Sequence, residues 1–349
     1  MTELPKIVAG VMAASICLLA PAGAQEASWD QIVEAARGEG KVVWYTDSTA
    51  PSIPKILEAF NRDYPFIEVE PVRLSSSPLV VRIQTELASG IHGADAVYTT
   101  SDQVVDEGVA GGWAETWQPP EIANFDPKYN DSDRSFVVAA IRILLAWNTT
   151  VVSEDERPRD WMDLVDARFR DKVGIVGPWT SPTIALWSAF VEKTLDKPDF
   201  AQQLLDNGVV INSSAANLSQ ALVRGDVSVA PMVDSAVKFL VEDGVPLEFA
   251  YPPSGTVASY KVAFVAAQAP HPNAAKVFVN WMLSENGQNA WKDVDGLAMA
   301  RTGIADPGYD LPGGHSEGLS NVILGKTLIS AEEAQELVGR WQEIFGLKQ

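Results

Sequence analysis

The apolar residues of this chain alternate between two spacings, one typical of buried strands and one typical of helices. Short and almost uniformly apolar runs predict buried strands at 41–45, 94–98, 173–176 and 227–233. Between the first two runs, apolar residues recur at helical spacing at Ile53, Ile56, Leu57 and Phe60. Strands that alternate with helices in this way predict an α/β fold built on mainly parallel sheets.

Hydroxyl and carboxylate side chains follow several of the predicted strands, just before the next helix begins. They are Asp47, Ser48, Thr49, Thr100, Ser101, Ser181, Thr183, Ser214, Asp234 and Ser235. The carboxyl ends of parallel strands meet at one edge of a sheet, where helix N-termini offer free N–H groups to a ligand. Each residue alone is also explained as a helix cap or turn residue, so the prediction of a binding edge rests on several converging there.

Two longer apolar runs, at 136–147 and 257–266, contain polar residues that need an explanation. Arg142 interrupts the first run, and an unpaired charge in a buried strand is costly. Arg142 therefore either contacts a ligand or forms an ion pair between two parts of the molecule. Tyr260 faces either a ligand or the core. Trp44, Trp147 and Trp281 are expected in the core.

The N-terminal segment predicts export. Residues 7–20 form an apolar run that is too short to cross a bilayer, and Ala22-Gly23-Ala24 follows as a cleavage site for signal peptidase. We expect residues 1–24 to be a signal peptide and the mature protein to work in the periplasm. Cys17, the only cysteine, lies inside this segment, so the mature chain has neither a disulfide nor a thiolate metal site.

The balance of charge limits the partners of the protein. Twenty-six Lys and Arg against 46 Asp and Glu give a net charge of −20, which disfavours binding to nucleic acid or to anionic lipid. No second long apolar run follows the first, so we expect the mature chain not to be embedded in a membrane.

The order of short motifs along the chain resembles a known family, the periplasmic solute-binding proteins of ABC importers. It resembles most closely the type II group around the ferric-iron-binding proteins. The matching segments are Val43–Thr46, Gly93–Tyr98, Gly111–Trp113, Ala146–Asn148, Gly225–Val227, Ala269–Ala275 and Phe278–Ser284. The resemblance implies two α/β lobes joined by two crossing strands that act as a hinge, with a solute held between the lobes. It also implies that residues 25–140 and 254–349 form one lobe and residues 141–253 the other.

The resemblance also bears on the solute. The positions that hold Fe(III) in iron-binding members fall here on Thr49, Thr100, Ser235 and Ala236, none of which suits a hard cation. An unusual iron site that uses Asp47, Asp102 and Asp234 stays open as an alternative. In those members the loops matched by Thr180–Pro182 and Ser213-Ser214 hold an accompanying anion, which implies an anion subsite in the second lobe.

We therefore expect the solute to be a small organic anion or zwitterion, such as a phosphonate, a phosphate ester, a carboxylate or an amino acid. Asp47 and Asp234 would bind an amino group, and Trp179 would stack on a cation or ring. An ABC permease would be the partner. We expect a monomer that needs no cofactor.

An exported hydrolase is the remaining alternative. The three histidines, His92, His271 and His315, are far apart in the sequence and form no metal-binding motif. The nucleophile motif Gly-x-Ser-x-Gly does not occur. We therefore expect the protein not to be an enzyme.

Overall fold

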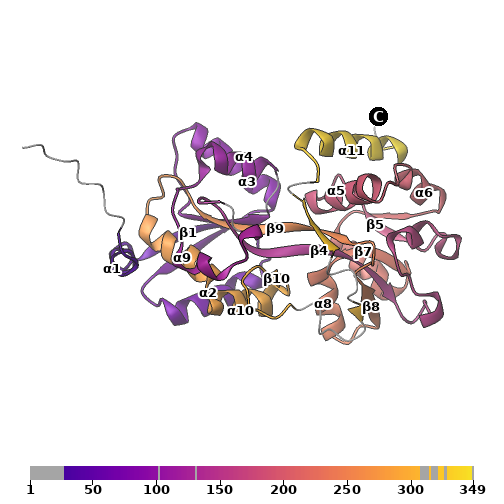
Figure 1. Ribbon diagram of the computed structural model, residues 1–349, viewed down its shortest axis with the longest axis horizontal. Helices are drawn as coiled ribbons and strands as arrows, with labels where there is room; N and C mark the ends of the chain where they lie inside the picture. The colour runs from indigo at the N-terminus through magenta and orange to yellow at the C-terminus, as the bar shows by residue number, and fades with distance from the viewer. Residues whose placement is uncertain are drawn as a thin grey trace, which may run out of the picture.

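Two lobes lie side by side and share two long strands (Figure 1). The computed structural model describes residues 27–100, 103–129, 132–306, 314–315, 321–325 and 328–347. The expected signal peptide, its Cys17 and the candidate contact Ser101 lie outside the described residues. None of the described helices is long and apolar enough to cross a membrane.

The first lobe is built on a sheet whose outer strands are parallel. β1 (Lys41–Thr46) lies between β2 (Glu68–Arg73) and β3 (Ala96–Thr100). Neighbouring residues of a strand point to opposite faces, so Trp44 packs against helices α9 and α10, whereas Tyr45 bonds to Glu86 of α3. The helices of this lobe are α1 (Trp29–Glu39), α2 (Ser52–Asp63), α3 (Ser76–Ala88), α4 (Gln103–Gly108), α9 (Pro272–Leu283) and α10 (Glu285–Asp295).

The second lobe repeats this plan on a smaller scale. β7 (Val229–Val233) and β8 (Leu247–Ala250) pair with one shared strand, while β5 (Gly174–Val176) and β6 (Val210–Asn212) form a parallel pair beside them. The helices of this lobe are α5 (Pro182–Ala189), α6 (Phe200–Asp206), α7 (Ala215–Arg224), α8 (Asp234–Glu242) and α11 (Ala331–Ile344). Shorter strands β10 (Ala298–Met299), β11 (Gly314–His315) and β12 (Val322–Leu324) extend the sheets.

Two strands run from one lobe into the other. β4 (Phe136–Asn148) and β9 (Thr256–Val265) pair antiparallel, with Arg142 opposite Ala258. On β4 the side chains up to Ala140 belong to the core of the first lobe, and those from Ile143 onward belong to the core of the second. The two long apolar runs of the sequence, at 136–147 and 257–266, are therefore strands that bury residues in two separate cores.

Aromatic side chains fill both cores. In the first lobe Tyr98 stacks on Trp291 with ring centroids 4.4 Å apart, and Trp44 packs edge-on against the same ring. In the second lobe Trp161 and Trp187 pack edge-on, with ring centroids 5.5 Å apart. Trp44, Trp147 and Trp281 are all buried, as the sequence predicts. With so much apolar area removed from water, burial is the main source of stability.

The C-terminal helix differs from the expected division into lobes. The resemblance assigns residues 254–349 to the first lobe, but α11 packs in the second, through Leu337 and Trp341. Figure 1 shows α11 lying over α5 and α6. The indole N–H of Trp341 donates to the buried carboxylate of Glu192 at 2.7 Å, and Arg340 pairs with the same carboxylate. The apolar face of α11 and this buried acceptor explain why the chain returns to the second lobe.

Replacement of Trp341 by Ala tests how α11 is held. We expect Trp341→Ala to lower the free energy of unfolding by about 3–5 kcal/mol, because it empties a buried site and leaves Glu192 without its indole donor. The matched control is Leu347→Ala, since Leu347 is 54% exposed and should change stability by less than about 0.5 kcal/mol. Urea unfolding followed by circular dichroism measures both. Equal midpoints for the two variants would contradict this account of α11.

Candidate functional site

The carboxylate of Asp47 is the centre of a hydrogen-bond network at the carboxyl end of β1. One oxygen accepts from Ser76 Oγ at 2.7 Å, from Thr99 Oγ1 at 3.2 Å, and from both N and Oγ1 of Thr100 at 2.9 Å. The other oxygen accepts from Lys261 Nζ at 2.6 Å. From the sequence, Asp47 was expected to bind an amino group of the solute. In the structure an internal amino group, that of Lys261, already holds this carboxylate.

Burial and pairing act in opposite directions on the Asp47 carboxyl. Burial alone would raise its pKa, but the charge of Lys261 and the donated hydrogen bonds outweigh burial and lower the pKa below its ordinary value. Lys261 lies on β9 opposite Thr100 of β3, so the pairing of these strands brings its ammonium to the end of β1. At neutral pH Asp47 is therefore ionised, and the ammonium of Lys261 balances its negative charge.

Asp234 is the corresponding carboxylate of the second lobe, at the end of β7 and the start of α8. Arg142 donates to it from Nε at 2.8 Å, and Tyr251 lies within 3.4 Å of the same oxygen. The other two guanidinium nitrogens of Arg142 bind Asp306 at 2.6 and 2.8 Å. The sequence left two roles open for Arg142, a ligand contact or an ion pair. In the structure Arg142 forms ion pairs with Asp234 and Asp306.

The Arg142 guanidinium stays charged although it is buried. Burial disfavours its charge, but Tyr251, Asp234 and Asp306 more than compensate and hold its pKa well above the ordinary value. Arg142 and Asp234 are each 5% exposed at the side chain. Asp234 is thus neutralised from inside the protein, as Asp47 is, and both carboxylates that the sequence offered for a cationic group carry an internal partner.

Most other candidate residues of the first lobe make contacts within the protein. Ser48 is buried and bonded to Thr46 at 2.8 Å, whereas the exposed Thr49 lies 2.6 Å from Ser52 Oγ. Thr100 is committed to Asp47. Tyr260 is buried, with its ring against Tyr129. The sequence allowed Tyr260 to face either a ligand or the core, and the structure places it in the core.

The candidate residues of the second lobe divide into two groups. Thr183 is buried and bonded to Ser259 of β9 at 2.8 Å, and the ring of Trp179 packs against Phe345. Ser235 donates its backbone N–H to Asp234. In contrast, Ser181 and Ser214 both line a cavity of about 230 Å³ in the second lobe.

This second-lobe cavity is formed where three helices begin. It is lined by Val176, Thr180, Ser181, Ile184, Ser213, Ser214, Ala215, Leu218, Pro231, Met232, Val233 and Ala236. Ser181 is the N-cap of α5, Ser214 is the N-cap of α7, and Ala236 lies in the first turn of α8. None of the lining residues carries a charged side chain. The cavity therefore combines hydroxyl groups and helix N-termini with an apolar wall.

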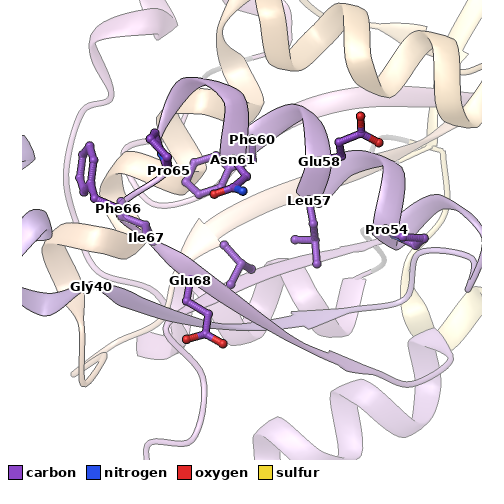
Figure 2. Close-up of a pocket in the computed structure, with 11 residues that line it drawn as sticks. Gly40, Pro54, Leu57, Glu58, Phe60, Asn61, Pro65, Phe66, Ile67 and Glu68 are labelled. Carbon is purple, nitrogen blue, oxygen red and sulfur yellow. The ribbon is translucent and has the colours of Figure 1, made fainter.

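A larger hollow lies on the first lobe, between α2 and the edge strand β2 (Figure 2). Its volume is about 600 Å³. Figure 2 shows Leu57 extending from α2 toward β2, whereas the carboxylates of Glu58 and Glu68 point away from the hollow. Its charged lining residues are acidic and its other walls are mainly apolar, so it suits an anion less well than the second-lobe cavity does.

A metal centre has little support in the part of the chain that the structure describes. These residues contain no group of three or more His, Cys, Asp or Glu side chains placed to hold an ion. Of the acids proposed for an unusual iron site, Asp47 and Asp234 bind Lys261 and Arg142. Asp102 lies outside the described residues.

Lys261 and Asp306, which pair with the candidate residues Asp47 and Arg142, were not predicted from the sequence. Lys261 had a usable signal, because it is a single charge inside an apolar strand, just as Arg142 is. Asp306 had none, since it lies 164 residues beyond Arg142 in an irregular segment.

Comparison with known proteins identifies the family. Residues 55–311 match the model of the bacterial extracellular solute-binding proteins. A curated protein of Haemophilus influenzae, described as uncharacterized, is 31% identical over 157 residues, which are 43% of this chain and 45% of that protein. The match thus spans about half the length of that relative.

Solved structures share the fold over most of the chain. Iron-bound HitA from Pseudomonas aeruginosa has a TM-score of 0.72 at 23% identity, covering 86% of this chain and 99% of HitA. AfuA from Actinobacillus pleuropneumoniae, with fructose-6-phosphate bound, has a TM-score of 0.71 at 22% identity, covering 89% and 100%. A substrate-binding protein of an ABC transporter from Agrobacterium tumefaciens has a TM-score of 0.76 at 13% identity, covering 88% and 94%.

The family match covers more than half of the chain, and the two-lobed α/β fold with its crossing strands agrees with it. The chain belongs to the bacterial extracellular solute-binding proteins and has the type II fold of periplasmic binding proteins.

Proposed function

We propose that this protein captures a small organic anion or zwitterion in the periplasm and delivers it to the permease of an ABC importer. The observation that carries the proposal is the second-lobe cavity, into which α5 and α7 present their N-termini and hydroxyl groups. The signal peptide, the permease and a monomeric state follow from the resemblance and the sequence, and they are part of the same proposal.

The chemistry of the cavity favours a negative group. The Ser181 side chain makes no capping bond with α5, so its hydroxyl is available together with the backbone N–H of Thr183. Pro182 has no N–H, and Ile184 donates its N–H to the carbonyl oxygen of Ser181. A helix N-terminus favours an anion by about 0.3–1 kcal/mol, and by about 2 kcal/mol when partly buried. No carboxylate in the lining competes with such an anion.

The size of the cavity suits a small solute or the acidic end of a larger one. Cavities that enclose drug-sized ligands measure about 300–1,000 Å³, whereas this one measures about 230 Å³. The phosphate, phosphonate or carboxylate group would lie in this cavity, and a longer solute would extend from it toward the first lobe. Closure of the lobes over the solute would then signal the loaded state to the permease.

Two structural relatives were solved with different kinds of ligand, which suggest two alternative solutes. AfuA was solved with a phosphate ester, fructose-6-phosphate, whereas HitA was solved with iron. The second-lobe cavity supports the first kind of ligand for this chain, and the neutralised Asp47 and Asp234 argue against the second. Iron binding and hydrolysis remain as outcomes of the first test.

A thermal-shift screen of the mature protein tests the class of solute. We expect a phosphate ester, phosphonate, carboxylate or amino acid to raise Tm without being consumed, because ligand at 100 times its Kd stabilises by about 2.7 kcal/mol. Chromatography of the solute before and after incubation is the control for turnover. Stabilisation by Fe(III) alone, or consumption of the solute, would overturn the proposal.

Substitutions in the cavity test where the acidic group binds. With an acidic hit from the screen, we expect Ser181→Ala to weaken binding about 10-fold and Ser181→Ala with Ser213→Ala about 100-fold, since each lost bond to a charged group costs roughly 1.5–3 kcal/mol. Ser219→Ala is the control, because Ser219 lies on α7 outside the cavity and its hydroxyl donates to a carbonyl of its own helix. Calorimetric titration measures all three. Unchanged affinity in the double variant would place the acidic group elsewhere.

A further inference from the structure

Asp295, the last residue of α10, differs from the other two buried carboxylates described above. Asp47 is paired with Lys261 and Asp234 with Arg142, but no described residue forms a salt bridge with Asp295. Its recorded hydrogen bond comes from the hydroxyl of Ser52, the first residue of α2. Burial raises the pKa of the Asp295 carboxyl above its ordinary value, although the hydrogen bond from Ser52 and the charge of Lys261 act against burial.

Asp295 lies where the two lobes meet. The next residue, Gly296, ends α10 in the left-handed conformation and touches α8 of the second lobe. A methyl group placed on Gly296 would come within 2.7 Å of Cδ of Lys238 and 3.5 Å of the ring of Phe239. The ammonium of Lys238 is itself paired with Glu242 at 2.9 Å. Ala236, less than one turn earlier on α8, lines the second-lobe cavity.

A second observation points to a missing partner at this place. The hydroxyl of Tyr98 is completely buried and has no hydrogen-bond partner among the residues that the structure describes. The Tyr98 ring stacks on Trp291, which is one helical turn before Asp295 on the same face of α10. Burial first, and then Asp295 and Asp47, raise the pKa of Tyr98 well above its ordinary value. Buried hydroxyls without a partner are rare, so this hydroxyl marks a place where a polar partner is missing.

The charges around this point do not balance. Lys261 supplies one positive charge, and Asp47 and Asp295 together supply two negative charges. Lys261 is already committed to Asp47 at 2.6 Å. A partly buried carboxylate in this position favours a cation.

We infer that Asp295 binds a cationic nitrogen group of the solute, such as an ammonium group, while the acidic group of the same solute occupies the second-lobe cavity. The substrate class is then a zwitterion whose two charged ends are bound by different lobes. The inference rests on the proposed function and deepens it. It also explains how a zwitterion would favour closure, because each end would contribute its bond only when the lobes come together.

Matched pairs of probes with and without an amino group test the inference. The pairs are 2-aminoethyl phosphate with ethyl phosphate, and 3-aminopropanoate with propanoate, titrated calorimetrically into the mature protein at pH 7. We expect the amino member of at least one pair to bind 10-fold or more tightly than its partner. In Asp295→Asn we expect that preference to disappear through weaker binding of the amino member, with the affinity for the other member unchanged.

Two variants separate this role from a structural one. Asp293→Asn is the matched control, since Asp293 lies two residues earlier and its side chain is 72% exposed, and it should keep the preference. Asp295→Asn keeps an oxygen to accept from Ser52, so circular dichroism should show an intact fold, and Asp295→Glu should restore part of the preference. If Asp295→Asn weakens both members of a pair equally, Asp295 is structural and the inference fails.

The remaining outcomes distinguish this inference from the proposal on which it rests. If wild-type protein binds both members of each pair with equal affinity, the anion site stands and the role of Asp295 is overturned. If sodium or potassium chloride alone raises Tm in wild type but not in Asp295→Asn, the site holds an inorganic cation and the inference is again overturned. If no probe binds at all, both proposals fail.

Discussion

Each crossing strand carries one buried cation, and each cation neutralises a carboxylate at the end of a strand in one lobe. Lys261 of β9 binds Asp47 after β1, and Arg142 of β4 binds Asp234 after β7. Ionised carboxylates in these positions would be very costly without a partner. The two strands that join the lobes thus also set the electrostatics of the region between them.

The energetic meaning of these pairs follows from their burial. The side chains of Arg142 and Asp234 are each 5% exposed, and those of Lys261 and Asp47 are 12% and 3% exposed. Bringing such charges out of water costs about as much as their attraction returns, so the pairs contribute little net stability. Losing one partner is far more damaging, because it leaves a buried charge alone. The pairs therefore fix the positions of these side chains more than they stabilise the fold.

The fold was predictable from the sequence to the extent that it depends on local pattern. The run at 41–45 became β1, the helical spacing from Ile53 to Phe60 became α2, and both long apolar runs became crossing strands. Strand and helix periods are set by neighbouring residues, so they can be read directly. The position of α11 could not be read, because it depends on Glu192, 149 residues away from Trp341.

The site was predictable only where its residues belong to local motifs. Ser181 and Ser214 occupy the N-cap positions of α5 and α7, and both line the second-lobe cavity. The anion subsite that the resemblance implied for these loops stays a prediction. Asp47 and Asp234 were placed at strand ends by the sequence, but their internal partners lie 214 and 92 residues away and could not be predicted. Asp295 gave no signal, since it reads as an ordinary acid at the end of a polar helix. Which carboxylate is neutralised is a property of the tertiary structure alone.

The return of α11 to the second lobe adds a third passage of the chain between the lobes. After Ala300, in the first core, the chain pairs with β8 through β11 and ends on the second core through Trp341. Two bodies joined by two neighbouring strands could both bend and twist about that junction. Because α1 packs in the first core through Ala36 and α11 packs in the second through Trp341, either motion would change the distance between these two helices.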